Sequence, residues 1–260
     1  MEEQKITIEV KKLSIGYRNT EVAGNINFKL HSKELCAIIG VNGVGKSTLL
    51  RTLGKLQPKL SGHIFIEQQL LEDYSTLDFA KQTSVVLTEL IASKNLTVSE
   101  LITLGRQPYT NWLGSLTSKD KKHITESISN FELESFKEKK CHELSDGQLQ
   151  RVLIARAMAQ DTPLILLDEP TTHLDLYHKV QILKLLQKLA HQYHKTIVFT
   201  THEIDLAIQL CDKILVLDGK ENHFGSPCEL IEQGCFTNLF PPEMIHFDEK
   251  TGSFKVNKSF

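Results

Sequence analysis

The sequence of 260 residues predicts an α/β fold built on a mostly parallel sheet. Three short segments, Leu35–Ile39, Leu164–Leu167 and Ile197–Thr200, are apolar almost throughout, as are strands that are covered on both faces. Between the last two segments, residues 180–189 repeat apolar side chains at helical spacing. This alternation of strand and helix favours parallel strands that are joined by helical crossovers.

The beginning of the chain predicts an antiparallel β-region that leads into this sheet. Lys5–Val10 and Asn25–Leu30 alternate apolar and polar side chains, as strands with one solvent-facing side do. Leu35–Ile39 then runs into a glycine-rich stretch, followed by a helix over Lys46–Gly54 that glycine ends.

The middle of the chain predicts an inserted helical subdomain. Residues 96–140 carry many charges and show little of the strand pattern. Apolar side chains recur at helical spacing within this range, over Ser118–Phe136, and again over Leu149–Ala159. We therefore expect one domain over residues 1–260, with an α/β core of residues 1–92 and 156–260 and a helical subdomain of residues 93–155.

The composition excludes several classes of protein. Hydrophobic residues make up 40% of the chain and charged residues 24%, which excludes collagen-like and disordered chains. The formal net charge is −2, so the charge balance predicts no nucleic-acid partner. The five cysteines form no C-x-x-C pair, and we expect reduced thiols rather than disulfides or a zinc site.

The sequence also predicts a cytoplasmic location. The first residues lack the basic and apolar regions of a secretory signal. Every apolar run is much shorter than the roughly 18 residues of a membrane-spanning helix.

The stretch Gly40–Ser47 reads G-x-x-x-x-G-K-S between a buried strand and a helix, the setting of a phosphate loop. Backbone N–H groups at the helix N-terminus can bind phosphates, Lys46 adds a cation, and the Ser47 hydroxyl can ligate Mg²⁺. This pattern predicts the core of a P-loop NTPase that binds ATP and Mg²⁺, rather than an ordinary glycine-rich turn. The expected nucleotide contacts in this phosphate loop and the following turn are Gly40, Asn42, Gly43, Val44, Gly45, Lys46, Ser47 and Thr48.

Two acidic residues, Asp168 and Glu169, follow the apolar strand Leu164–Leu167. Ligands gather at the carboxyl ends of parallel strands, so Asp168 is predicted to reach Mg²⁺ and Glu169 to accept a proton from the attacking water. Acidic pairs after strands also cap helices, and the phosphate loop is what favours the catalytic interpretation.

The segment Leu144–Gln148, called the signature segment below, reads L-S-D-G-Q and precedes a helix. Ser145 and Gln148 have the spacing of a capping box, so this segment by itself predicts only a helix start. Together with the phosphate loop, Leu164–Pro170, Thr172–Asp175 and Thr201-His202, it resembles the nucleotide-binding subunit of ATP-binding cassette transporters. The resemblance extends from Ile6 to about Gly225.

This resemblance implies a head-to-tail homodimer that hydrolyses ATP at two shared sites. In such dimers Ser145, Gly147 and Gln148 bind the γ-phosphate held by the partner's phosphate loop, and Asp175 lies in a loop between the subunits. Tyr17 matches the aromatic residue that stacks on adenine. The implied catalytic residues are Glu169, Lys46 and His202, the last of which contacts the γ-phosphate and the attacking water.

Two positions depart from the usual family pattern. Asp146 stands where the family has glycine, and its charge favours the helix but would repel a phosphate if it pointed inward. Glu89 aligns with a glutamine that coordinates Mg²⁺ in the family, and a glutamate can ligate Mg²⁺ but cannot donate an amide hydrogen bond.

Within the family, Thr171–Asp175 and Leu104–Tyr109 look most like the importers of iron-siderophore, haem and cobalamin type. The implied protein is an ATPase at the cytoplasmic face of the membrane, with separate permease subunits and, indirectly, an extracytoplasmic substrate-binding protein. An alternative is a soluble cassette ATPase that acts in assembly or repair. A P-loop kinase would leave Leu144–Gln148 and His202 unexplained.

The same resemblance predicts where the membrane subunit docks. Part of the apolar set in Leu96–Leu116 must be the core of the helical subdomain. The turn Pro108–Gly114 contains the only tryptophan, Trp112, and has little core of its own. We expect this turn and Glu89 to line a groove for a short helix of the permease.

Overall fold

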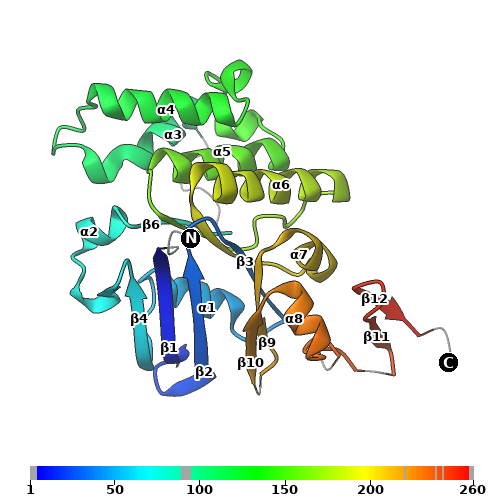
Figure 1. Ribbon diagram of the computed structural model, residues 1–260. Helices are drawn as coiled ribbons and strands as arrows, with labels where there is room; N and C mark the ends of the chain where they lie inside the picture. Colours follow the sequence, from blue (N-terminus) through cyan, green and yellow to red (C-terminus); the bar gives the residue numbers. More distant parts are fainter. Residues whose placement is uncertain (1–4, 89–94, 220, 238, 242, 258–260) are drawn as a thin grey trace.

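The computed structural model describes residues 5–88, 95–219, 221–237, 239–241 and 243–257. It contains an antiparallel sheet and a larger, mostly parallel one (Figure 1). The antiparallel sheet has the order β2 (Thr20–His31), β1 (Ile6–Tyr17), β4 (Ser61–Ile66) and β5 (Gln69–Leu70). The larger sheet has the order β10 (Asn222–Gly225), β9 (Lys213–Leu217), β3 (Leu35–Gly40), β8 (Thr196–Thr200), β7 (Leu164–Leu167) and β6 (Thr83–Val86).

Five strands of the larger sheet, from β9 to β6, are parallel, and β10 is antiparallel to β9 at one edge. The helices are α1 (Lys46–Leu53), α2 (Thr76–Ala80), α3 (Val98–Thr103), α4 (Ser118–Asn130), α5 (Asp146–Ala159), α6 (Leu176–Tyr193), α7 (Ile204–Leu210) and α8 (Pro227–Glu232). The predicted α/β class, with an antiparallel β-region before a mostly parallel sheet, is confirmed.

The two faces of the larger sheet are covered by different layers, which explains why strands β3 and β7 are apolar throughout. In β3, Cys36 and Ile38 belong to the core shared with α1 and the antiparallel sheet. Leu35, Ala37 and Ile39 belong to the core shared with α3 to α6. Side chains alternate between the faces of a strand, so both faces must be apolar when both are buried.

The middle of the chain is helical where the sequence predicted helices. Short helices α3 and α4 and a 3₁₀ segment, Leu104–Tyr109, lie above the sheet, with α5 beneath them (Figure 1). Helix α5 continues to Ala159 and thus passes the expected boundary at residue 155 without a break. Val98, Ile124 and Val152 share one core with the sheet residues Ile165 and Leu167.

Several elements were missed by the sequence patterns. Strand β9 contains a buried run, Ile214–Leu217, that resembles the run in β7 and could have been predicted by the same rule. The turn-rich end of the chain forms α8 and a hairpin of β11 (Ile245–Asp248) and β12 (Ser253–Val256). The Phe247 ring of β11 packs against Phe236, which follows α8, and against Phe254 of β12, with ring centres 5.0 Å apart in each pair.

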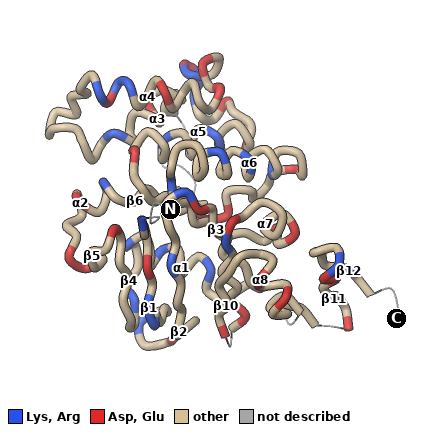
Figure 2. The backbone as a smooth tube through the Cα atoms, in the orientation of Figure 1, with Lys and Arg blue, Asp and Glu red and all other residues tan. Residues whose placement is uncertain are grey.

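Charged residues of both signs are interspersed over the whole fold (Figure 2). No helix among the described residues has both the length and the apolar composition needed to cross a membrane. Because positive and negative residues are mixed, the charge at a site is set by the few residues that lie there. At the carboxyl ends of β3 and β7 these residues are Lys46, Asp168 and Glu169.

Candidate functional site

The phosphate loop connects the carboxyl end of β3 to the N-terminus of α1. Gly40 adopts φ 149°, and a Cβ atom there would lie 2.2 Å from the Leu217 carbonyl oxygen, so only glycine fits beside β9. Gly45 is the left-handed N-cap of α1 with φ 107°. The first turn of α1 contains no acidic residue, so no side chain of the helix itself neutralises the positive end of its dipole.

Lys46 is buried, and its ammonium group is held by the loop itself. Its Nζ donates hydrogen bonds to the carbonyl oxygens of Gly40 (2.9 Å) and Val41 (3.2 Å). Burial lowers the pKa of Lys46, while the carboxylates of Glu169 and Asp168 oppose that shift. The loop thus holds a cation in the field of two carboxylates.

Asp168 and Ser47 meet across the parallel sheet. Ser47 Oγ donates a hydrogen bond to Asp168 Oδ1 (3.0 Å), and Thr200 Oγ1 donates to the same oxygen (2.7 Å). The register pairs Leu167 with Phe199, which brings Thr200 beside Asp168. Thr200 was not among the predicted residues, although a threonine at the end of a neighbouring parallel strand could have been singled out by the same strand-end rule.

Glu169 is held by three groups. Its Oε1 accepts a hydrogen bond from His202 Nε2 (2.8 Å), and its Oε2 accepts one from Thr172 Oγ1 (2.9 Å). Its backbone N–H donates to Thr200 Oγ1 (2.8 Å). Burial by itself would raise the pKa of Glu169, but these two side-chain hydrogen bonds and the charge of Lys46 outweigh burial and lower it. The carboxyl group is consequently ionised and able to accept a proton.

Residues from four segments that are distant in the sequence line one cavity of about 390 Å³. Its lining consists of Tyr17, Val22, Asn42, Gly43, Gly45, Lys46, Ser47, Thr48, Glu169 and His202. Tyr17 is 56% exposed, and its hydroxyl lies 3.1 Å from Thr48 Oγ1. Val44 is buried beneath the loop, and Asp168 lies next to the lining through its bond to Ser47.

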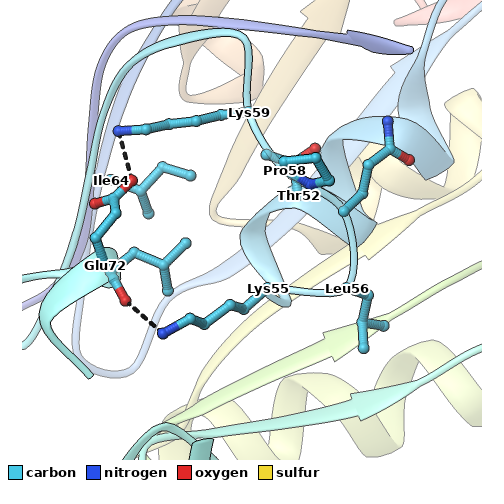
Figure 3. Close-up of a pocket in the computed structure, with 9 residues that line it drawn as sticks. Thr52, Lys55, Leu56, Pro58, Lys59, Ile64 and Glu72 are labelled. Carbon is cyan, nitrogen blue, oxygen red and sulfur yellow. Dashed lines mark hydrogen bonds and ion pairs between the residues drawn. The ribbon is translucent and has the colours of Figure 1, made fainter. Parts of the chain in front are cut away.

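A larger cavity of about 460 Å³ lies elsewhere, between the end of α1 and β4 (Figure 3). Its two lysines are already bound within the fold, Lys55 to the carbonyl oxygens of Leu71 and Tyr74, and Lys59 to Glu72. The smaller cavity, in contrast, is lined by the glycine-rich loop and the N-terminus of α1, and it is therefore the one with the chemistry of a phosphate site.

The signature segment does not line the cavity of its own chain. Ser145 caps α5, since its Oγ accepts from the Gln148 backbone N–H (3.3 Å) while Gln148 Oε1 accepts from the Ser145 N–H (3.0 Å). Asp146 is exposed in the first turn of α5, and Gly147 lies beside the start of α6. Asp175 caps α6 by accepting from the His178 backbone N–H (2.9 Å). Glu89 lies outside the described residues.

Comparisons with known sequences identify the family of this chain. A profile of the family described as ABC transporter matches residues 23–172. A petrobactin import ATP-binding protein of Bacillus anthracis is 35% identical to this chain, and the matched part covers 91% of this chain and 87% of the relative. The chain belongs to the ABC transporter family. An uncharacterized ABC transporter ATP-binding protein of Methanocaldococcus jannaschii is 37% identical over 97% of this chain and 87% of its own length.

Solved ABC structures share the fold. A metal-chelate type ABC transporter in an inward-facing conformation matches with a TM-score of 0.79 and 29% identity, covering 90% of this chain and 89% of that chain. A dimeric ATP-binding cassette bound to ADP and inorganic phosphate matches with a TM-score of 0.70 and 29% identity, covering 83% of this chain and 97% of that chain. This ABC family hydrolyses ATP, and the chain is accordingly an ABC ATPase with the P-loop NTPase fold.

Proposed function

We propose that this ABC ATPase drives the import of an iron-siderophore or a related metal chelate through separate membrane subunits. The similarity to a petrobactin importer over nine-tenths of the chain is the observation that carries this proposal. The likeness to a metal-chelate type transporter supports the same class of substrate. The chelate itself would be bound by the other subunits, at the membrane and outside it.

The hydrolytic roles are assigned from the cavity. Tyr17 would stack on adenine, while Lys46 and the N–H groups of the phosphate loop bind the phosphates. Ser47 Oγ and Asp168 Oδ1 lie 3.0 Å apart and are hard oxygen ligands, so they fit Mg²⁺, which would neutralise phosphate charge. Glu169 would accept the proton of the attacking water, and His202 would orient Glu169 and reach the γ-phosphate.

A head-to-tail dimer would complete the site. The signature segment is partly exposed and lies outside the cavity of its own chain. It is therefore free to face the nucleotide cavity of a second copy. The N-terminus of α5 would then direct its N–H groups and those of Ser145 and Gly147 to the γ-phosphate. Asp146 is exposed and is compatible with this role if its carboxylate faces away from the nucleotide.

The membrane subunit would dock on the turn Pro108–Gly114. Trp112 is 91% exposed and Leu113 is 67% exposed, whereas Leu101 in the same predicted set belongs to the core. A tryptophan exposed to this degree on a loop is typical of an interface. We propose that this turn, with Glu89, receives a short helix of the permease and responds to nucleotide.

The turn is firmly attached to the rest of the fold. Buried Arg106 donates hydrogen bonds to Asp120 Oδ1 (2.8 Å) and to the Ala159 carbonyl oxygen (2.8 Å) at the end of α5. Its guanidinium lies 3.9 Å from the centre of the Tyr109 ring. Movement of the signature helix α5 would therefore carry the docking turn with it.

The proposal is tested by ATP-driven uptake of a ferric siderophore into vesicles that contain the permease and this subunit. Trp112→Ala should retain the ATPase activity of the isolated subunit but lose co-purification with the permease and uptake. Met244→Ala is the matched control, because Met244 is 66% exposed and precedes β11, far from the helical layer in Figure 1. Unchanged assembly of Trp112→Ala would refute docking at this turn, and uptake that does not depend on the subunit would favour the soluble alternative.

A further inference from the structure

The hydroxyl group of Thr200 bridges the two acidic residues of the site. Its Oγ1 donates a hydrogen bond to Asp168 Oδ1 (2.7 Å) and accepts one from the backbone N–H of Glu169 (2.8 Å). A hydroxyl group has one proton and two lone pairs, so these bonds use its only proton and one lone pair. Thr200 is fully buried at the end of β8, and burial shields both bonds from solvent.

The carboxylate of Asp168 is oriented from β8, while its backbone is held from the other neighbouring strand. The Asp168 N–H donates to the carbonyl oxygen of Val86 in β6 (2.8 Å). Asp168 Oδ1 also accepts a bond from Ser47 Oγ (3.0 Å), but Ser47 lines the cavity and is itself a proposed Mg²⁺ ligand. Thr200 is not among the residues that line the cavity, so it acts on the carboxylate and not on the nucleotide.

Glu169 has a backbone conformation that depends on support from its surroundings. Its φ of 47° lies in the left-handed region, which side chains other than glycine rarely adopt. Such conformations persist where neighbouring contacts hold them. Here Thr200 Oγ1 accepts the Glu169 N–H, and His202 Nε2 donates to Glu169 Oε1 (2.8 Å). The end of β8 and the residues that follow it thus hold both the backbone and the carboxylate of the proposed base.

We infer that Thr200 is a positioning residue for ATP hydrolysis: its hydroxyl group holds the carboxylate of Asp168 and the backbone of Glu169 in one fixed arrangement. This inference rests on the proposed roles of Asp168 at Mg²⁺ and of Glu169 at the attacking water. Because Thr200 touches both residues but not the cavity, loss of its hydroxyl group should affect turnover and the contribution of Mg²⁺ to nucleotide binding. Binding of nucleotide without Mg²⁺ should be unchanged.

Two variants of Thr200 separate its hydroxyl group from its shape. Thr200→Val keeps the branched shape but leaves the Glu169 N–H and Asp168 Oδ1 without this partner. Thr200→Ser keeps the hydroxyl group and removes only a methyl group. Rescue by serine is therefore expected if the hydrogen bonds matter, and it is not expected if Thr200 only fills space in the core.

Thr196→Val is the matched control within the same strand. Thr196 is equally buried at the other end of β8, and its Oγ1 lies 2.8 Å from Thr7 Oγ1 and 3.0 Å from the carbonyl oxygen of His31. The same chemical change there removes two hydrogen bonds without touching the acidic pair. Both valine variants should consequently lower the thermal midpoint by similar amounts.

Two measurements are compared among these variants: kcat from phosphate release, and the affinity for a non-hydrolysable ATP analogue titrated with and without Mg²⁺. In Thr200→Val, kcat should fall about five- to tenfold, and the gain in affinity that Mg²⁺ provides should fall about threefold. The affinity without Mg²⁺ should stay at the wild-type value. Thr200→Ser and Thr196→Val should match the wild type in kcat and in the effect of Mg²⁺.

The inference is overturned if Thr200→Val keeps the wild-type kcat or the wild-type effect of Mg²⁺, if Thr200→Ser loses as much as Thr200→Val, or if Thr196→Val lowers kcat to the same extent. Asp168→Asn and Glu169→Gln serve as references for the proposed roles of the acidic pair. If Asp168→Asn keeps the effect of Mg²⁺ and Glu169→Gln keeps kcat, the proposed site fails. If both references lose these properties while Thr200→Val does not, only the role of Thr200 fails.

Discussion

Replacing Glu169 by glutamine removes one charge from the nucleotide cavity with little change of shape. The glutamine Oε1 can still accept a hydrogen bond from Thr172 or His202, which lie 2.9 Å and 2.8 Å from the carboxylate oxygens. The amide nitrogen cannot accept the second bond, and it cannot accept a proton from water. The variant therefore tests the base without dismantling the site.

The expected loss of turnover is about 100- to 1,000-fold, which corresponds to about 3–4 kcal/mol of transition-state stabilisation. Nucleotide binding should remain, because the contacts of Lys46 to Gly40 and Val41 and the phosphate loop are unchanged. Loss of the Glu169 charge also removes repulsion toward the γ-phosphate. The variant should accordingly accumulate as an ATP-bound dimer.

A phosphate-release assay measures turnover, and light scattering with and without MgATP measures the dimer. Glu203→Gln is the matched control: it makes the same chemical change next to His202, at a residue that pairs with Lys179 and lies outside the cavity lining. Its turnover should stay close to the wild-type value. Near wild-type turnover of Glu169→Gln would refute Glu169 as the base.

Four further outcomes are expected. Lys46→Ala should lose MgATP binding and hydrolysis, while Tyr17→Ala should cost about 1–2 kcal/mol of binding in calorimetric titration; normal hydrolysis by Lys46→Ala would contradict the phosphate-loop assignment. Thr172→Val removes a hydrogen bond that lowers the pKa of Glu169, so this pKa should rise and the acid limb of kcat/KM should move to higher pH; an unmoved limb argues against Glu169 as the titrating group. Arg106→Met leaves Asp120 buried without its cation and should lower the free energy of unfolding in urea by about 3–5 kcal/mol. Arg151→Met is the control, because Arg151 pairs with the exposed Glu132, and it should lower this free energy by less than about 1 kcal/mol.

Much of the fold followed from local pattern. The apolar runs of β3, β7 and β8 are unambiguous because strands that are buried on both faces tolerate no polar alternation. The capping boxes at Ser145 and the aspartate cap at Asp175 are likewise local, since a cap joins residues three positions apart. The hairpin near the C-terminus was missed because β11 and β12 are short and half-exposed, and their pattern resembles that of turns.

The candidate site, like the fold, was predicted only in part from the sequence. Its phosphate loop and acidic pair could be predicted because spacing along the chain and the strand-end rule locate them. The orientation of those groups could not, because Thr200 reaches Asp168 and Thr172 reaches Glu169 only through the sheet register and a loop conformation.

The sequence by itself determined the phosphate-binding residues and the elements with a clear pattern, such as β3, α1, β7 and α6, because each of these depends on side chains within a few positions of one another. Tertiary structure decided which members of an apolar set are buried: Leu101 faces the core, while Trp112 of the same predicted set is on the surface. It also decided that Arg106 donates a hydrogen bond to the carbonyl oxygen of Ala159, 53 positions away, because only the packing of the helical layer brings the 3₁₀ segment Leu104–Tyr109 to the end of α5. Contacts between distant segments depend on how layers pack, and periodicity within one element carries no information about its neighbours.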